Sequence, residues 1–379
     1  MYLSDFSCLL FQIHSQHPTG SNFALHFSII MATQKALVVT SIGQPVELKS
    51  SWPLHKPGPN QVQIQVTVAA LNPHDAKARD FGLMIKDDLP ALLANDVAGV
   101  VTALGSGVSK FKIGDAVFGY SGITPGHAQK GLQKYALLDE DYTVKVPQGF
   151  SEHQAATIPV NLSAGLIALF EGNTLGLPAP WSEEAKTFDY ANTQLLIIGG
   201  GSNCGKYAIQ LAQLAGIGKI VVVGGQEQEL KKYGASHVLD RHGGYEVVLG
   251  RIRKVVGDDL VYCLDAVNNP EGQSLGIDAL SSSKKSRFAR LVPLSPPDTS
   301  KIAPKNAEFE VKDVMGIPHF WPGLAKPFFE RLGQYLTDGI IVPQQYVVEE
   351  GLNAAKVNEV LDRYRDGKPV TQTHFRISK

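Results

Sequence analysis

Hydrophobic and polar positions alternate through the first third of the chain. From Gln61 onward every second residue, up to Val68, is a valine or isoleucine with a polar neighbour on each side for most of the run. A period of two predicts a strand with one buried face. The stretches 36–40 and 99–105 continue this theme, and glycine-containing turns are expected at 105–107 and 113–115. Residues 32 to about 150 are therefore expected to form a module of short β-strands.

Beyond Ser151 the pattern changes to short, continuous apolar runs separated by segments that can form helices. Strands that are covered on both faces have this character, and their alternation with helices predicts βαβ units and a parallel sheet. A helix is expected from Lys206 to Ala215, directly after the first run. The runs are Leu195 to Ile198, Lys219 to Val223, Leu260 to Leu264 and Phe288 to Val292.

Three further segments interrupt or follow this alternation. Residues 172–192, which contain proline, tryptophan and acidic side chains, are expected to form a surface loop that carries no core. Residues 354–364 have helical spacing, and 370–377 are expected to form a final strand that rejoins the first module. No internal repeat is evident.

Length and charge limit the classes of function. The chain has 379 residues, which favours two domains, and its 35 Lys and Arg balance 36 Asp and Glu. No charge excess draws it to nucleic acid or to an acidic membrane surface, so a small-molecule substrate is expected. The three cysteines, Cys8, Cys204 and Cys263, have no paired spacing, which favours a reduced, cytoplasmic protein.

No run of about 18 to 20 apolar residues, the length of a membrane span, occurs in the sequence. The first thirty residues contain neither lysine nor arginine, so they match neither a secretory signal nor a transit peptide. We expect Met31 to be the natural start and residues 1–31 to be a disordered extension.

A glycine-rich turn follows the run that ends at Ile198. Glycine there allows a tight turn and lets backbone N–H groups approach a pyrophosphate, while the helix after the turn offers its positive end to the phosphates. This turn predicts a dinucleotide site, although an ordinary strand-to-helix turn is the alternative because Cys204 replaces the third glycine of the GxGxxG form. The turn comprises Gly199, Gly200, Gly201, Ser202, Asn203, Cys204 and Gly205.

The next run ends at Gly224, Gly225 and Gln226, where a site specific for NAD usually has an Asp or Glu for the ribose 2′-hydroxyl. The missing acid removes repulsion against a 2′-phosphate, so NADPH is favoured over NADH. Lys231, Lys232 and Tyr233 lie near enough in sequence to supply charge and a hydrogen bond, with a solvated helix face as the alternative for the lysines.

With these motifs in hand, the chain resembles the medium-chain dehydrogenase/reductase superfamily across nearly all of 32–379. Residues 99–119 resemble its GxVxxxGxxVxxxxxGDxVxG signature, and 155–165 resemble the segment that joins its two domains. Residues 232–240 and 263–267 resemble the ends of later strands of its nucleotide domain. These matches occur in the correct order, which makes the resemblance specific.

The resemblance implies a fold of the α/β class: a GroES-like, β-rich catalytic domain plus a Rossmann domain with a doubly wound parallel sheet. The expected boundaries are 32–158 and 342–379 for the catalytic domain and 159–341 for the domain that binds NADP. The active site is expected in the cleft between them, in a monomer or a homodimer.

The zinc ligands of the superfamily's metal-dependent members are missing. Asn72 occupies the place of an early cysteine, and Asn95 with Asp96 replaces a His-Glu pair; asparagine is not a useful zinc ligand. The structural zinc lobe of four cysteines is also absent. His74, His127 and His153 are interpreted as scattered surface histidines, so no metal is expected.

The Asn-Pro-x-Asp motif at Asn72 is similar to the zinc-free branch of quinone oxidoreductases and enoyl reductases. Within that branch the chain resembles fungal enoyl reductases that act in trans with polyketide synthases, which implies a synthase partner. Cofactor contacts are expected from the glycine-rich turn, residues 199–205, and from the positions that match or neighbour the family's motifs. These are Asn72, Pro73, His74, Asp75, Ser163, Gly224, Gly225, Gln226, Lys231, Tyr233, Leu264, Gly367 and Lys368.

Without a metal, the simplest chemistry is conjugate reduction, in which hydride passes from NADPH to the β-carbon of an enone or enoyl substrate. Asn72 is expected to steady the enolate oxygen. The sequence does not identify the proton source: Lys77, Tyr120 and water are candidates, and Tyr120 is alternatively a packing residue. Quinone reduction, and nucleotide binding without catalysis, are the alternative functions.

Overall fold

A six-stranded parallel sheet organises the second half of the chain in this computed structural model, which describes residues 32–122 and 128–378. Every neighbouring pair of strands is parallel, so the predicted parallel sheet is confirmed. In spatial order the strands are β11 (His237–Leu239), β10 (Lys219–Val223), β9 (Gln194–Ile198), β12 (Tyr262–Asp265), β13 (Ser286–Arg290) and β14 (Phe309–Asp313).

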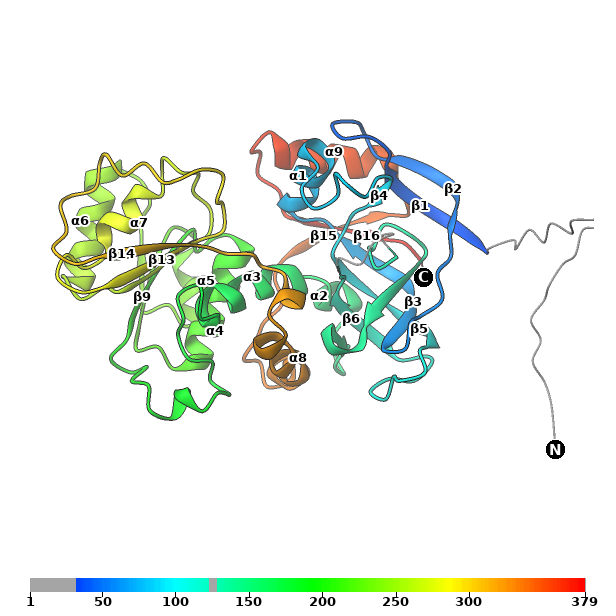
Figure 1. Cartoon of the computed structure of the whole chain (residues 1–379), viewed down its shortest axis with the longest axis horizontal. Coiled ribbons are helices and arrows are strands. Elements are labelled where there is room, and N and C mark those ends of the chain that lie inside the picture. The colour runs from blue at the N-terminus through cyan, green and yellow to red at the C-terminus, as the bar shows by residue number, and fades with distance from the viewer. Residues whose placement is uncertain (1–31, 123–127, 379) are drawn as a thin grey trace, which may run out of the picture. The chain divides into compact units, whose positions relative to one another are not determined.

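Helices cover both faces of this sheet, which explains its continuous apolar strands. Leu195 and Ile197 of β9 pack in one cluster with α3 (Pro159–Phe170) and α4 (Asn203–Ala215). Leu196 and Ile198 face the other side, where they pack with α6 (Tyr245–Val256) and α7 (Ser274–Ala279). Figure 1 shows α6 and α7 on the opposite side of the strands from α4 and α5 (Glu227–Lys232).

The remaining strands form two sheets. One contains seven strands: β15 (Tyr346–Glu350), β16 (Gln372–Arg376), β3 (Gln61–Ala70), β5 (Asp96–Leu104), β6 (Ala116–Tyr120) and β8 (Thr143–Lys145) in order, with β7 (Tyr135–Asp139) paired to β3. The other has the order β2 (Glu47–Pro53), β1 (Thr33–Val39) and β4 (Ala91–Leu92). The C-terminal strand β16 runs antiparallel to β3 and opposes His374 to Ala70, so the final strand rejoins the first module as predicted.

A helix absent from the sequence expectations interrupts the β-rich part. It is α1 (Pro73–Phe81), which begins at Pro73 and ends against Gly82 in a left-handed conformation. The Asp75 carboxylate accepts a hydrogen bond from the backbone N–H of Asn72, and proline at the first helical position is favourable. The Asn-Pro-x-Asp motif is thus a helix start. The other helical segments are α2 (Glu152–Ala155), α8 (Pro322–Thr337), α9 (Ala354–Arg365) and the short turns η1 (Glu140–Tyr142), η2 (Glu184–Lys186) and η3 (Pro318–Phe320).

The expectation that residues 172–192 carry no core is wrong. Leu175 and Leu177 are each 1% exposed and belong to the same apolar cluster as α3 and α4. Trp181 packs against this cluster, with its ring 5.4 Å from that of Phe328 on α8. The segment lacks a regular spacing of apolar residues, so the sequence pattern does not predict that its apolar side chains are buried.

One apolar cluster joins the β-rich part to the parallel sheet. It contains Val68, Ala98 and Phe118 of the seven-stranded sheet together with Leu195 and residues of α3. Everything from Thr33 onward therefore belongs to one compact unit, and the domain boundaries expected within it stay a prediction. The expectation for residues 1–31 lies outside the described residues. None of the described helices has the length and apolar character to cross a membrane.

Candidate functional site

The glycine-rich turn lies between β9 and α4, and close packing explains several of its glycines. Gly199 has a φ of +86°, in the left-handed region that favours glycine. A Cβ on Gly200 would lie 2.0 Å from Val222, and a Cβ on Gly205 would lie 2.3 Å from the carbonyl oxygen of Gly199. Side chains at these positions would push the turn apart.

The first residues of α4 present unpaired backbone donors. Helix α4 begins at Asn203 rather than at Lys206 as predicted, and Ser202 is its N-cap. The Ser202 hydroxyl accepts from the N–H of Gly205 at 3.1 Å and donates to the carbonyl of Gly199 at 2.8 Å. Within the described part of the chain, the N–H groups of Gly201 and Asn203 have no recorded acceptor. Free N–H groups at a helix start suit a pyrophosphate.

The turn after β10 lies directly against this cradle. A Cβ on Gly201 would be 3.1 Å from the Cα of Gly225, and Gly224 and Gly225 both have positive φ angles, +79° and +101°. Gln226 stands where a site specific for NAD usually has an acidic side chain. The two turns together fit the dinucleotide half that carries the adenosine ribose.

An arginine missed by the sequence reasoning lies at this edge. A Cβ on Gly224 would come within 3.4 Å of the Cδ of Arg241, so the arginine stem packs on the turn. Arg241 is exposed, and no hydrogen bond or ion pair of its guanidinium is recorded among the described residues. Since β11 pairs in parallel with β10, a residue just after β11 could have been expected at this edge.

Two of the side chains predicted to supply charge and a hydrogen bond to a 2′-phosphate, those of Lys231 and Tyr233, already have partners within the protein. Lys231 forms an ion pair of 2.7 Å with Glu227 one turn earlier. Tyr233 donates to Glu229 at 3.4 Å, and Lys206 of α4 forms an ion pair with the same carboxylate at 2.7 Å. Lys232 is exposed. Arg241 is therefore the better candidate for phosphate recognition.

Asn72 sits in a buried polar network that reaches from the seven-stranded sheet to α4. Its side-chain N–H group donates to Asp96 at 2.7 Å, and its oxygen accepts from Asn161 of α3 at 2.9 Å. Cys204 of α4 donates to the Asn161 oxygen at 3.3 Å. Burial raises the pKa of the Cys204 thiol to about 12, so this donor keeps its proton. The network fixes the position of Asn72 relative to the nucleotide turn.

Asp96 is the centre of this network and was not predicted as a functional residue. Its carboxylate also accepts from the backbone N–H of Val160 at 2.7 Å and from Gln372 of β16 at 3.1 Å. It is fully buried, and this burial raises its pKa to about 7 despite the hydrogen bonds. Asn203 donates to Gln372 at 3.4 Å, which adds a second link to α4.

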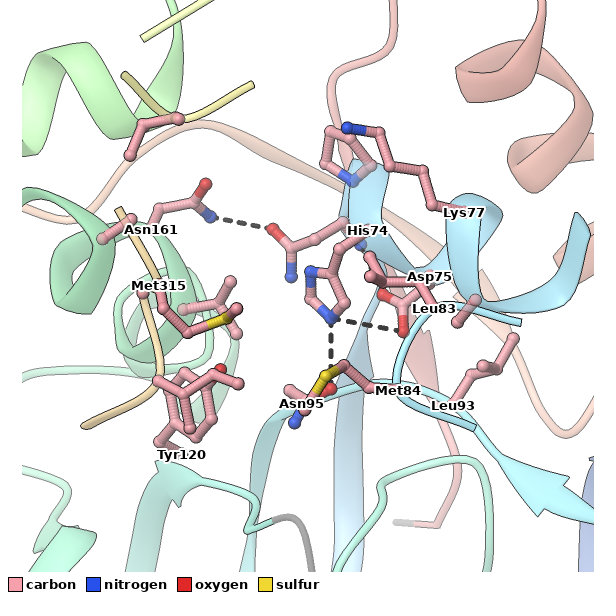
Figure 2. A pocket seen from close by; sticks show the side chains of 18 of the residues that line it. His74, Asp75, Lys77, Leu83, Met84, Leu93, Asn95, Tyr120, Asn161 and Met315 are labelled. Carbon is pink, nitrogen blue, oxygen red and sulfur yellow. Dashed lines mark hydrogen bonds and ion pairs between the residues drawn. The ribbon is translucent and has the colours of Figure 1, made fainter. Parts of the chain in front are cut away.

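A cavity of about 300 Å³ adjoins this network. Asn72, Asn161 and Cys204 line it, and so does Ala266 just after β12. Apolar side chains contribute most of the remaining wall, as is usual for small-molecule pockets. These apolar residues include Leu83, Met84, Leu93, Val314 and Met315, and several of them are labelled in Figure 2.

His74, predicted to contact the cofactor, projects into this cavity. Its ring nitrogen Nε2 lies 3.1 Å from Oδ1 of Asn95, and the Asn95 amide donates to the carbonyl of Ser121 at 2.9 Å. Figure 2 shows His74 pointing towards Asn95. Because Asn95 is thus oriented, it holds the imidazole in place. His153 stacks on Tyr346 and His374 instead, at ring distances of 5.4 and 5.5 Å, and His127 lies outside the described residues.

Asp75, predicted as a cofactor contact, has a structural position. One carboxylate oxygen accepts from the N–H of Asn72 at 2.8 Å, and the other accepts from the N–H of Ala94 at 2.9 Å. The side chain is 1% exposed. Asp75 therefore ties the start of α1 to the segment after β4, although it also reaches the cavity wall.

Three basic or phenolic side chains of the cavity wall can carry a proton. Burial lowers the pKa of Lys77 on α1, and burial raises that of Tyr120 on β6. Burial also lowers the pKa of Lys130 to about 8. In Figure 2 the Lys77 amine lies on the opposite side of His74 from Asn95 and Tyr120. Lys130 was missed because no sequence pattern marks it.

Several predicted residues lie away from the cavity wall. Ser163 is buried within α3, and the Leu264 side chain is buried in the apolar cluster, so that Ala266 rather than Leu264 lines the cavity. Gly367 and Lys368 lie in the loop after α9, where the Lys368 amine is 3.5 Å from Asp366. Among the described residues, no hydrogen bond connects this loop with the nucleotide turn.

The residues described here offer no group of three or more His, Cys, Asp or Glu side chains that could hold a metal ion. At the two places where metal-dependent relatives carry zinc ligands, Asn72 is bonded to Asp96 and Asn95 orients His74. The donor set therefore does not fit a catalytic zinc, which needs three nitrogen, sulfur or carboxylate ligands.

Comparison with known proteins agrees with this geometry. Residues 58–148 match the family model of the alcohol dehydrogenase GroES-like domain. The trans-enoyl reductase tazE of Aspergillus terreus is 31% identical over 271 residues, which are 69% of this chain and 85% of that protein. The dehydrogenase azaJ of Aspergillus niger is 32% identical over 215 residues, 55% of this chain; the match spans only 61% of that protein's length.

Solved structures show the same architecture. The quinone oxidoreductase of Pseudomonas syringae pv. Tomato DC3000 matches with a TM-score of 0.69 at 19% identity, covering 90% of this chain and 99% of that one. At this sequence identity the similarity supports the fold alone. The predicted combination of a GroES-like domain with a Rossmann-type parallel sheet is thereby confirmed.

Proposed function

Because the chain belongs to the medium-chain dehydrogenase/reductase family, in the branch of quinone oxidoreductases and fungal trans-enoyl reductases, we propose that it is an NADPH-dependent, zinc-independent reductase of activated C=C bonds. The family uses nicotinamide cofactors. One observation carries the proposal: Cys204, at the start of the helix that would hold the phosphates, lines the same cavity as Asn72, His74 and Tyr120. This adjacency supports the proposal that the reactive end of a nucleotide on the turn enters a small, mostly apolar pocket.

Conjugate reduction fits this pocket better than alcohol oxidation. NADPH, when bound, supplies the hydride. The chain need only hold the alkene against it, exclude water and steady the negative charge that develops on the carbonyl oxygen. Asn72 has one amide proton engaged by Asp96, which leaves the other for that oxygen. The neutral Tyr120 hydroxyl, without a recorded partner in the described part of the chain, is a second donor.

A panel of acceptors tests this proposal. NADPH oxidation would be followed at its absorbance maximum with enones, enoyl thioesters and quinones, and NADP⁺ reduction would be followed with alcohols. We expect turnover of alkenes conjugated to a carbonyl, unchanged after treatment with a metal chelator. Turnover of quinones alone would favour the quinone oxidoreductase alternative. Tight NADPH binding without turnover of any acceptor would favour a non-catalytic nucleotide-binding role.

A synthase partner is proposed on narrower grounds. The support is the name of tazE as a trans-enoyl reductase together with a cavity that holds the reacting part of a chain rather than a large molecule. If the partner is a polyketide synthase, reduction should be faster for an enoyl group attached to a carrier protein than for the same group on a free thiol. Equal rates would remove the support.

A further inference from the structure

Most polar side chains of the cavity already have partners within the protein. Asn72 and Asn161 bond to each other, His74 bonds to Asn95, and both oxygens of Asp75 accept backbone N–H groups. Three side chains of the wall have no hydrogen bond or ion pair recorded among the described residues: Lys77, Tyr120 and Lys130. These three are free to interact with whatever enters.

Lys130 is the most deeply buried charge of the three. Only 8% of it is exposed, whereas Lys77 is half-buried. Its backbone is fixed next to β4, because the N–H of Gly131 donates to Ala94 at 2.9 Å. The side chain of Gln133 in turn donates to the carbonyl of Lys130 at 2.8 Å. The ammonium is thus held at the cavity by a rigid segment.

A buried ammonium without a partner is unfavourable, because it has lost the water that would solvate it. Asp75 favours the charge of Lys130 through space, but no ion pair joins the two side chains among the described residues, and each Asp75 oxygen already accepts a backbone N–H group. Nothing in the described structure therefore compensates the ammonium fully. A negatively charged oxygen or carbon atom of a bound substrate would compensate the charge of the ammonium.

We propose that Lys130 is the general acid that completes the reduction, by giving its proton to the α-carbon of the acceptor. This inference rests on the proposed function. The hydride forms the new C–H bond at the β-carbon and leaves NADP⁺ and an enolate. The N–H bond of Lys130 then breaks, a C–H bond forms at the α-carbon, and the neutral amine recovers a proton from water.

The acidity of Lys130 suits this role, and that of Tyr120 does not. A pKa near 8 means that the ammonium exists at neutral pH and releases its proton readily. Burial keeps the proton on Tyr120, which can donate a hydrogen bond but is a poor acid. The other titratable groups on the cavity and on the elements packed around Lys130 are His74, Asp75, Lys77, Asp88, Asp96, Asp139, Cys204 and His319.

Two substitutions at Lys130 and one matched control test the proposal. Lys130→Met removes the ammonium, Lys130→Arg keeps the charge but not an acid of suitable pKa, and Lys134→Met alters an exposed lysine of the same segment. We expect NADPH affinity to be unchanged in all three, which also verifies folding. We expect kcat to fall by about 10²-fold or more in both Lys130 variants. Wild-type kcat should decline above about pH 8, the pKa of Lys130, and this decline should be missing in the variants.

A second readout does not depend on turnover. Competitive acetylation of amines across pH, read by mass spectrometry, should show Lys130 titrating near pH 8 and becoming protected when an unreactive ketone fills the cavity. A Lys130→Met enzyme with wild-type kcat and pH profile, or a Lys130 that titrates like an exposed lysine, would overturn the role of Lys130 alone. A wild-type enzyme that reduces no alkene would overturn the proposed function and this role together.

Discussion

At the residue scale, the nucleotide turn contains glycines that do not tolerate a side chain and one residue, Ser202, that can be substituted. A Cβ on Gly200 or Gly205 would collide with neighbouring atoms, so substitutions there would distort the turn itself. Ser202 is different, because its side chain caps α4 and lies beside the unpaired N–H groups of Gly201 and Asn203. A test of phosphate binding should therefore be made at Ser202.

Ser202→Asp places a carboxylate at the cradle while keeping an N-cap of comparable quality, and Ser202→Asn supplies the same shape without the charge. We expect the aspartate to weaken NADPH binding by about tenfold or more through repulsion of the phosphates, and the asparagine to bind nearly as wild type. Equilibrium fluorescence titration gives both values. Equal affinities for the two variants would mean that the phosphates bind elsewhere.

Arg241 supports a prediction about cofactor choice. Its stem packs on Gly224, where an acid for the ribose hydroxyls of NADH is missing. We expect Arg241→Ala to raise the Kd for NADPH by about tenfold, because a charge-assisted contact is lost, and to leave the Kd for NADH unchanged. Lys232→Ala, on the neighbouring exposed surface, is the control. Parallel losses for both cofactors in Arg241→Ala would contradict a role in recognising the 2′-phosphate.

The sequence predicted individual site residues unevenly. The glycine-rich turn could be found because such turns leave a local signature, and Asn72 could be found because it matches a motif of the family that the chain resembles. Lys130 and Arg241 have no such local signature. Each reaches its site only because the fold brings together segments that are distant in the sequence. The structural contact of Asp75 could not be predicted for the same reason: its partner Ala94 is 19 residues away.

At the scale of elements, Asp96 connects β5 to α1, α3 and β16 through hydrogen bonds to its carboxylate or to its partner Asn72. The raised pKa has a definite consequence for stability. In the unfolded chain the pKa of this carboxyl is about 4, whereas in the folded protein it is about 7. Between these two pH values the folded state binds more protons than the unfolded state. The contribution of Asp96 to the free energy of unfolding therefore falls as pH rises and is constant above about pH 7.

Asp96→Asn should remove that dependence. The difference in unfolding free energy between wild type and variant should therefore shrink as pH rises from about 4 to about 7, the interval set by the folded pKa, and then stay level. Denaturant unfolding at matched ionic strength measures it, and other titrating groups cancel in the difference. A difference that grows over this interval would show that Asp96 is held as a carboxylate with a depressed pKa.

The 172–192 segment provides the second prediction at this scale. Leu177 is 1% exposed among α3 and α4 side chains, so Leu177→Ala should lower the unfolding free energy by about 2 to 5 kcal/mol. Leu294, which is 68% exposed, is the control, and its replacement by alanine should change stability by less than about 0.5 kcal/mol. A loss below about 1 kcal/mol at Leu177 would mean that the segment is only loosely attached.

At the scale of the whole molecule, periodicity predicted the strands better than it predicted their surroundings. The parallel sheet and the final strand were found because buried strands are either continuously apolar or alternating. Helix α1 was not predicted, because a single capping motif is its only local signal. The buried side chains of 172–192 were not predicted either, because no local motif marks them. The cavity arises where α1, α3, α4 and the loop around Met315 meet, and such a meeting of distant segments leaves no local pattern.

The central claim is that the nucleotide turn and the cavity form one reaction site for an activated alkene. Incubation with NADPH carrying deuterium at the transferable C4 position, followed by mass spectrometry and NMR of the reduced product, tests it most directly. The account predicts one deuterium at the β-carbon and a solvent-derived proton at the α-carbon. Deuterium on a carbinol carbon, or an alkene recovered intact while NADPH is bound, would contradict it.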